Sequence, residues 1–280
     1  MAARTSGWRR VAAAIWGDPE DPQIYGMVEV EGAPILEFIE GARRAGHHVT
    51  VTHLVGRAIA LALRQVPELN VRIRGGREYP RKTVDVFFIT AVAGGHDLSG
   101  VKVAGADQKP AVEIASELSA GAGRLRSGKD PGFARAKQLT DRLPPSILRP
   151  VLRFGAWRSG QLAKAVPIMK VQPEPFGSAM VSSVGMFGMP SGFAPLSWMY
   201  HVPLAIVVGS VQDKPVAVRG RVEIHPMLPL TATIDHRYAD GWHLSHFFQA
   251  FRGYLENPSA FEPAQAPPRP VEIAGEPAHA

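Results

Sequence analysis

The chain has 280 residues, of which 45% are apolar and 20% charged, with a formal net charge of +6 and no cysteine. This composition describes a globular chain long enough for one large domain or two small ones, and it excludes disulfides, thiolate catalysis and zinc–cysteine sites. The basic residues form no motif interleaved with aromatic residues, so we expect no nucleic-acid partner. The absence of cysteine favours a cytoplasmic location. The N-terminal apolar run is too short for a signal peptide, and no apolar run is long enough to cross a bilayer.

The first part of the chain alternates short strands and helices. Residues 27–31 alternate in polarity and predict a strand, and residues 34–44 predict a helix that opens with proline. A strongly apolar helix is predicted over 50–66, where Pro67 ends it. Strands are then predicted from 71, over 84–93 and over 101–103, followed by an amphipathic helix over 109–126. His47, His48 and His53 lack the spacing of a metal site, so they indicate surface or helix-start positions and no metal is expected.

Residues 130–176 have a different character. They mix basic and apolar side chains, include Pro144-Pro145, and have a helix-like stretch over 146–162. An amphipathic helical hairpin on an anionic membrane surface would have this pattern. A lid, or an arm that packs against a neighbouring subunit, would have it too, and we favour this second interpretation.

The next segment holds a serine and two glycines, and predicted strands follow it. Residues 177–188, GSAMVSSVGMFG, contain Ser182, and Gly185 and Gly188 follow it closely. The glycines would permit a tight turn or a close approach of another backbone. A continuously apolar, central strand is predicted over 203–211, and a hairpin-like pair over 214–227.

A histidine then stands where a strand ends. Leu228 to Ile234 alternate, Asp235-His236-Arg237 and Tyr238-Ala239-Asp240-Gly241 follow, and apolar spacing predicts a helix over 242–255. Imidazole can accept a proton near neutral pH, which makes His236 a candidate general base. Residue type alone favours a surface or capping histidine, so the wider pattern has to decide.

That pattern resembles a known family. His-Arg-x-x-Asp-Gly after an apolar strand resembles the catalytic core of the dihydrolipoamide acyltransferases of 2-oxo acid dehydrogenase complexes, and His-x-x-x-Asp-Gly also resembles chloramphenicol acetyltransferase. Pro-Glu-Leu-Asn at 67–70 and the Ser182 strand are similar to the same family, although Ser183 replaces its asparagine and the turn over 94–99, with His96, departs from it. The resemblance covers roughly residues 8–261, with 130–176 as a helical insertion and 262–280 as a disordered Pro/Ala-rich tail.

The resemblance implies a fold and a chemistry. The fold would be a two-layer α/β sandwich with a mixed β-sheet, assembled as a homotrimer with its active site between subunits. The reaction would be acyl transfer between coenzyme A and a thiol or small-molecule acceptor. His236 would be the general base, Ser182 of a neighbouring subunit would stabilise the oxyanion, and Asp240 would hold the loop, with Arg9 or Arg10 as its partner.

Three functions remain open. A dihydrolipoamide acyltransferase would need a lipoyl group from another chain, because we expect none on these residues. A stand-alone acetyltransferase that resembles chloramphenicol acetyltransferase would act on a small molecule, and a non-catalytic scaffold for assembly or for a membrane surface would keep only the fold. We expect no cubic or icosahedral core, because a polar, proline-rich tail replaces the apolar C-terminus that joins trimers there.

Overall fold

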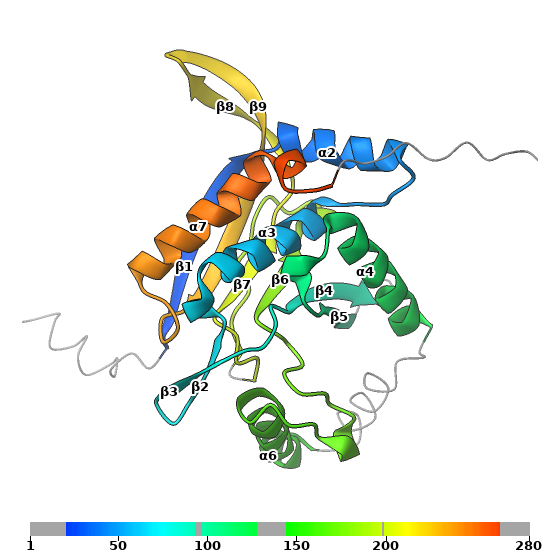
Figure 1. Cartoon of the computed structure of the whole chain (residues 1–280), viewed down its shortest axis with the longest axis vertical. Helices are drawn as coiled ribbons and strands as arrows, with labels where there is room; N and C mark the ends of the chain where they lie inside the picture. Colours follow the sequence, from blue (N-terminus) through cyan, green and yellow to red (C-terminus); the bar gives the residue numbers. More distant parts are fainter. Residues whose placement is uncertain (1–20, 93–96, 128–143, 198, 264–280) are drawn as a thin grey trace, which may run out of the picture.

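A mixed β-sheet forms the frame of the molecule (Figure 1). The computed structural model describes residues 21–92, 97–127, 144–197 and 199–263. In these residues the main sheet has the strands β1 (Gln23–Glu31), β4 (Val86–Val92), β5 (Asp97–Val103), β6 (Ala179–Ser183), β7 (Leu204–Val208), β8 (Gln212–Val218) and β9 (Arg221–Asp235). Their order is β1-β9-β7-β6-β4-β5, and β8 pairs with the first half of β9. The pairs β4–β6 and β6–β7 are parallel and the others antiparallel, so the predicted mixed sheet is confirmed.

Helices cover one face of this sheet. They are α2 (Ala33–Arg44), α3 (Val51–Gln65), α4 (Ala111–Arg126) and α7 (Gly241–Glu256). Alternate residues of β9, among them Leu230 and Ile234, join the core under these helices, as the alternating pattern predicts. Phe247, Phe251 and Tyr254 of α7 are fully buried there. Each such aromatic or aliphatic side chain stabilises the fold by about 1.5–3 kcal/mol through burial.

The opposite face of the sheet carries the polar residues of β9. Thr231, Thr233 and Asp235 alternate with the core residues of that strand and therefore point away from the helices. The chain over 189–203 crosses this face, where a small cluster of Met180, Val202 and Ala205 is buried. This second face is only partly covered within one copy of the chain.

Two further parts lie outside the sandwich. A separate hairpin of β2 (Val71–Arg74) and β3 (Arg77–Pro80) turns through Gly75 and Gly76, which both have positive φ. Helix α6 (Pro145–Ala156) continues into a wider turn at Trp157–Gln161 and lies below the sheet, near β2 (Figure 1). In the described part of 130–176, the predicted helical hairpin is a single α-helix with short turns; residues 128–143 lie outside the described part.

The C-terminal prediction needs a correction. Pro258–Ala260 forms a short 3-10 helix after α7, and Glu262 is 8% exposed. The tail predicted from 262 therefore begins too early, because the Glu262 carboxylate binds groups of α3, α4 and α7. Residues 264–280 lie outside the described part.

Candidate active site

His236 lies at the junction of β9 and α7. It directly follows Asp235, the last residue of β9, and its backbone N–H donates a hydrogen bond to the carbonyl oxygen of Pro22 at 2.8 Å. Its side chain is exposed. The strand therefore presents an accessible imidazole from a fixed backbone position.

Asp235 and Arg237 hold the two sides of this histidine. The buried Asp235 carboxylate accepts hydrogen bonds from the Arg237 backbone N–H at 3.0 Å, from Nε at 3.0 Å and from Nη2 at 2.5 Å. The Asp235 carbonyl oxygen accepts from Tyr238 N–H at 3.0 Å. Because the Arg237 side chain is largely exposed, this pair fixes geometry more than it adds stability. These contacts fix the backbone on both sides of His236.

Asp240 caps the N-terminus of α7. Its carboxylate accepts hydrogen bonds from Trp242 N–H at 3.0 Å and His243 N–H at 3.2 Å, and it contacts His243 Nδ1 at 2.7 Å. These bonds, first of all the one from the His243 backbone, lower the pKa of Asp240. The N-cap satisfies helix donors that would otherwise lack partners, so Asp240 holds the start of α7 against the loop that carries His236. Arg9 and Arg10, the partners predicted for Asp240, lie outside the described residues.

Ser182 lies on β6, on the face of the sheet that the helices leave free. It is half-buried and shares this face with Met180, whereas Val181 points into the core under the helices. The glycines that follow have the predicted roles. A Cβ on Gly185 would lie 2.4 Å from the Gly209 carbonyl oxygen, and Gly188 has a φ of +75°.

Ser182 and His236 are far apart within one copy of the chain. Ser182 pairs with Val207 of β7, and Val207 pairs with Thr231 of β9, so Ser182 lies level with a residue five positions before His236. With about 3.3 Å per residue along a strand and 4.8 Å between strands, the two residues are roughly 20 Å apart. One copy of the chain does not bring them together.

A buried polar network that the sequence did not indicate lies beside the His236 loop. Arg81, whose side chain is 4% exposed, donates to Glu174 Oε1 at 2.9 Å, to the His201 carbonyl oxygen at 2.7 Å and to that of Val71. Burial, followed by the charges of Arg237 and Arg81, lowers the pKa of His201. Burial also raises the pKa of Tyr238, which favours its neutral form. Arg81, Glu174 and His201 are distant from one another in sequence and belong to no motif, so no local signal could have identified them.

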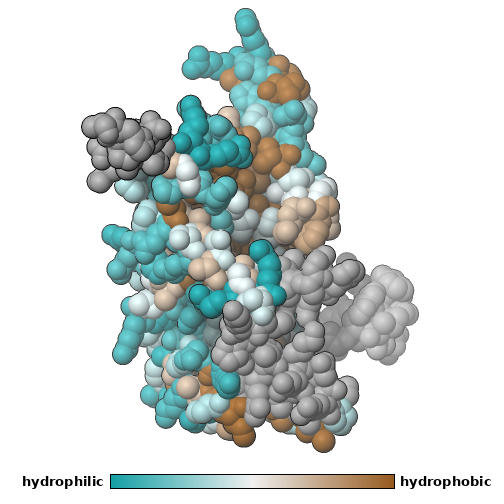
Figure 2. All heavy atoms as spheres, turned by 90° about the vertical axis from the view of Figure 1, so that its right-hand side faces the viewer, coloured by the Kyte–Doolittle hydropathy of each residue, from teal (hydrophilic) through white to brown (hydrophobic). Residues whose placement is uncertain are grey.

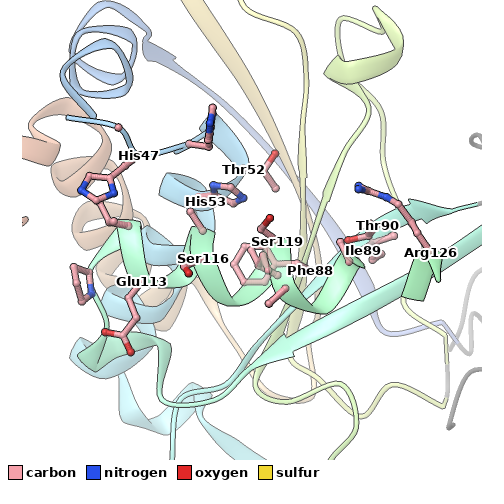
Figure 3. A pocket seen from close by; sticks show the side chains of 18 residues that line it. His47, Thr52, His53, Phe88, Ile89, Thr90, Glu113, Ser116, Ser119 and Arg126 are labelled. Carbon is pink, nitrogen blue, oxygen red and sulfur yellow. The ribbon is translucent and has the colours of Figure 1, made fainter. Parts of the chain in front are cut away.

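The three N-terminal histidines line a different site. His47, His48 and His53 border an open groove of about 1000 Å³ between the start of α3 and α4, floored by β4 (Figure 3). His53 Nδ1 accepts a hydrogen bond from Thr50 N–H at 3.1 Å, and burial lowers the pKa of His53 to about 4. The predicted helix-start and surface positions are confirmed. The groove lies on the helical side of the sheet, opposite the face that carries Ser182.

Among the described residues, no group of three or more histidine, cysteine, aspartate or glutamate side chains has the arrangement of a metal site. No helix in the described part of the chain has the length and apolar character needed to span a membrane. His96 lies outside the described residues.

Comparison with known families adds to this geometry. Residues 7–131 and 163–262 match the family of 2-oxoacid dehydrogenase acyltransferases (catalytic domain). The chain belongs to this family. The residues between the two matched segments, 132–162, include α6, so the helix is an addition to the part shared with the family.

Individual relatives agree with this assignment. The acetyltransferase component of the pyruvate dehydrogenase complex of Zymomonas mobilis is 24% identical over 263 residues, which are 91% of this chain and 50% of the relative. The structure of a probable dihydrolipoamide acetyltransferase from Listeria monocytogenes superposes with a TM-score of 0.64 at 21% identity, covering 95% of this chain and 98% of that chain. The Azotobacter vinelandii dihydrolipoamide acetyltransferase gives a TM-score of 0.62 at 20% identity, covering 86% and 84%. The predicted family and fold class are confirmed.

The chain spans half or less of the length of the first curated relatives it matches. These relatives and others include acetyltransferase and succinyltransferase components, so they share a reaction type while their acyl groups differ.

Proposed function

We propose that the protein transfers an acyl group between coenzyme A and a dihydrolipoyl-type thiol, with His236 as the general base. The observation that carries this proposal is the exposed imidazole at the end of β9, held by the Asp235–Arg237 pair and by the capped start of α7. Membership of the acyltransferase family supports it. Because the relatives act with different acyl groups, the proposal leaves the acyl group open.

The reaction needs one proton acceptor and one oxyanion donor. His236 takes the proton of the attacking thiol, and the sulfur forms a bond to the carbonyl carbon of the thioester. The carbonyl oxygen becomes an oxyanion, to which the Ser182 hydroxyl donates a hydrogen bond. The intermediate then collapses, its bond to the leaving sulfur breaks, and His236 returns the proton to that thiolate. A positioned base contributes roughly 10²–10⁴ in rate, and one oxyanion donor roughly 10²–10³.

The two residues would meet between copies of the chain, in a homotrimer. The separation of roughly 20 Å, estimated from strand spacing, supports a site shared between two copies. The part of the molecule that the helices leave free exposes several large apolar side chains, which a neighbouring subunit would bury. These are Tyr25, Met27, Met186, Phe187, Met189 and Phe193. The Azotobacter vinelandii structure supports the choice of His236 and Ser182 as the reacting pair. It was used to study the catalytic role of a serine, a histidine and an asparagine, and its histidine and asparagine have the same spacing in sequence as His236 and Asp240.

The partners follow from the reaction. Acyl-CoA is a substrate, and the dihydrolipoyl thiol would belong to a lipoyl group carried outside these 280 residues. We place the protein in the cytoplasm, where the reducing environment keeps a dithiol acceptor reduced.

A thiol-release assay tests the chemistry. Purified protein would be given acetyl-CoA or longer acyl-CoAs together with free dihydrolipoamide. Transfer should fall by at least about 10²-fold in His236→Ala and in Ser182→Ala, while both variants keep the assembly mass of the parent. Full activity of His236→Ala would refute the assignment of the base.

A mixing experiment tests the position of the site. Co-assembly of the His236→Ala and Ser182→Ala chains in equal amounts would create sites with both residues intact. If each site uses one residue from each of two neighbours, about a quarter of the sites should regain activity. No recovery, in mixed assemblies whose composition is verified by mass, would refute a site built from His236 of one copy and Ser182 of another.

A small-molecule acceptor is the second candidate, and one observation favours it. The turn after α6, in the segment not shared with the family, approaches the His236 loop: Arg72 donates to the Gln161 carbonyl oxygen at 3.3 Å, and a Cβ on Gly160 would lie 2.3 Å from the His201 ring. This addition could close the access of a large lipoyl domain. Transfer to amines or alcohols, but not to dihydrolipoamide, in the same assay would decide for this function.

A further inference from the structure

Helix α6 exposes an apolar stripe on the outside of the molecule. Ile147, Phe154 and Trp157 are 50%, 55% and 46% exposed, and their spacing of seven and three residues places them on one side of the helix. The rings of Phe154 and Trp157 lie 6.0 Å apart, centre to centre. Gly155 and Ala156, on the other side, are buried. The stripe is therefore separate from the face that attaches α6 to the body of the protein.

Positive charge lies along one flank of this stripe and continues beyond the helix. The sequence has six basic residues and no acidic residue between Asp141 and Glu174. Arg149 and Arg153 are exposed on one flank of the stripe, one helical turn apart. The cations continue beyond the helix with exposed Lys164 and Lys170, and Ile168 beside them is 78% exposed. Figure 2 shows hydrophobic atoms at the lower end of the molecule, the end at which α6 lies in Figure 1.

An anionic lipid surface matches this combination. Aromatic side chains with a polar edge favour the boundary between headgroups and acyl chains, and exposed arginine and lysine bind the phosphates above it. Each cation near an anionic leaflet adds attraction on the order of 1 kcal/mol. We propose that the α6 face, defined as Ile147, Arg149, Arg153, Phe154 and Trp157, attaches the protein to an anionic membrane surface without crossing it.

A second copy of the chain is a poorer match for the α6 face. A two-fold contact between antiparallel α6 helices would put the arginines of both copies on the same edge, and like charges brought together oppose association. The face also belongs to the segment 132–162, which the family match leaves out, so the assembly shared by the family does not depend on it. The α6 face contributes no residue to the proposed acyl transfer.

Vesicle co-sedimentation of the full chain tests the proposal. The vesicles would contain phosphatidylcholine alone, or phosphatidylcholine mixed with phosphatidylglycerol. We expect binding to the anionic vesicles only, weakened by salt. Arg149→Glu with Arg153→Glu should weaken binding by at least about 30-fold, and Phe154→Ser by about tenfold.

Matched controls lie on α2. Arg43→Glu with Arg44→Glu makes the same change of charge at two exposed positions, and Leu36→Ser replaces a side chain that is 41% exposed. Both controls should bind as the parent does. Acyl transfer to soluble acceptors should also stay unchanged in the α6 variants, so a failure of the attachment is distinguishable from a failure of the proposed function.

Three results would overturn the proposal. The first is equal binding to both kinds of vesicle, or none. The second is an α6 double variant that binds like the parent or like the α2 control. The third is a change of assembly mass in Phe154→Ser without lipid, which would make the α6 face a subunit contact.

Discussion

Glu262 offers a direct test of how the C-terminal end of the fold is held. Its carboxylate accepts hydrogen bonds from Arg57 Nε at 3.1 Å, from the Tyr254 hydroxyl at 2.9 Å and from the Ala111 backbone N–H at 2.7 Å. The Arg57 and Glu262 side chains are only 10% and 2% exposed. One carboxylate thus joins α3, α4 and α7, and it also satisfies the first N–H of α4, which has no side-chain N-cap.

Glu262→Ala should destabilise the protein strongly. The change leaves the Arg57 guanidinium buried with the Ala106 carbonyl oxygen at 3.0 Å as its hydrogen-bond partner, and it removes the acceptor of the other two donors. Breaking a buried pair by removing one partner costs about 3–5 kcal/mol. For a chain of this size that corresponds to a fall in melting temperature of roughly 10 °C. Differential scanning calorimetry and urea unfolding would measure it.

An exposed pair provides the control. Glu256 accepts from Arg252 Nε at 2.6 Å, with side chains 41% and 58% exposed, so Glu256→Ala should cost less than about 0.5 kcal/mol. Replacing both buried partners, with Arg57→Met and Glu262→Leu, should cost less than Glu262→Ala alone, because no unpaired charge remains. If Glu262→Ala unfolds within about 1 kcal/mol of the parent, the carboxylate does not hold the three helices together and the reasoning is wrong.

Three smaller effects should also be measurable. Gly185→Ala should destabilise the turn after β6 because its Cβ would lie 2.4 Å from a backbone oxygen, whereas Gly123→Ala, in open space on α4, should stabilise the fold by about 0.5–1 kcal/mol in urea unfolding. Asp240→Ala should lower the melting temperature by about 2 °C through loss of the N-cap and reduce acyl transfer, while Asp240→Asn should keep most of the stability. Hydrogen bonds to two glutamates raise the pKa of His225, so its contribution to stability is full below the unfolded pKa near 6.5 and is lost as pH rises through the higher folded value. His225→Gln should therefore flatten the dependence of the urea midpoint on pH in that window, and an unchanged slope would contradict this.

The parts of the fold with a local signal were predictable. Alternation in β9, the capping aspartate and the helical spacing of α7 all lie within one continuous stretch, so the position of His236 followed from sequence. The position of Ser182 followed from the resemblance of residues 177–188 to a motif of the acyltransferase family. Because these patterns involve neighbours in the chain, they need no knowledge of the tertiary structure.

The contacts between distant segments were not predictable. Glu262 lies in a stretch rich in proline and alanine that indicates disorder, and only the folded chain shows that its carboxylate meets Arg57, 205 residues away. The strand order, with β9 between β1 and β7, likewise depends on which apolar faces pack together. A single sequence gives the faces of the strands but not their partners.

The site and the added segment are physically connected. Arg81 binds the carbonyl oxygen of His201, the His201 ring packs against the turn after α6, and the charge of Arg237 acts on that same ring. A displacement of α6 would therefore move the backbone at His201, beside the loop whose aspartate–arginine pair holds His236. Contact of α6 with a membrane, or with any other partner, would thus act on the loop through packed groups rather than through a flexible linker. This connection predicts that the KM for the acceptor differs between vesicle-bound and free protein when His236 and Ser182 are intact. Equal KM values in both states would show that α6 anchors the protein without acting on the site.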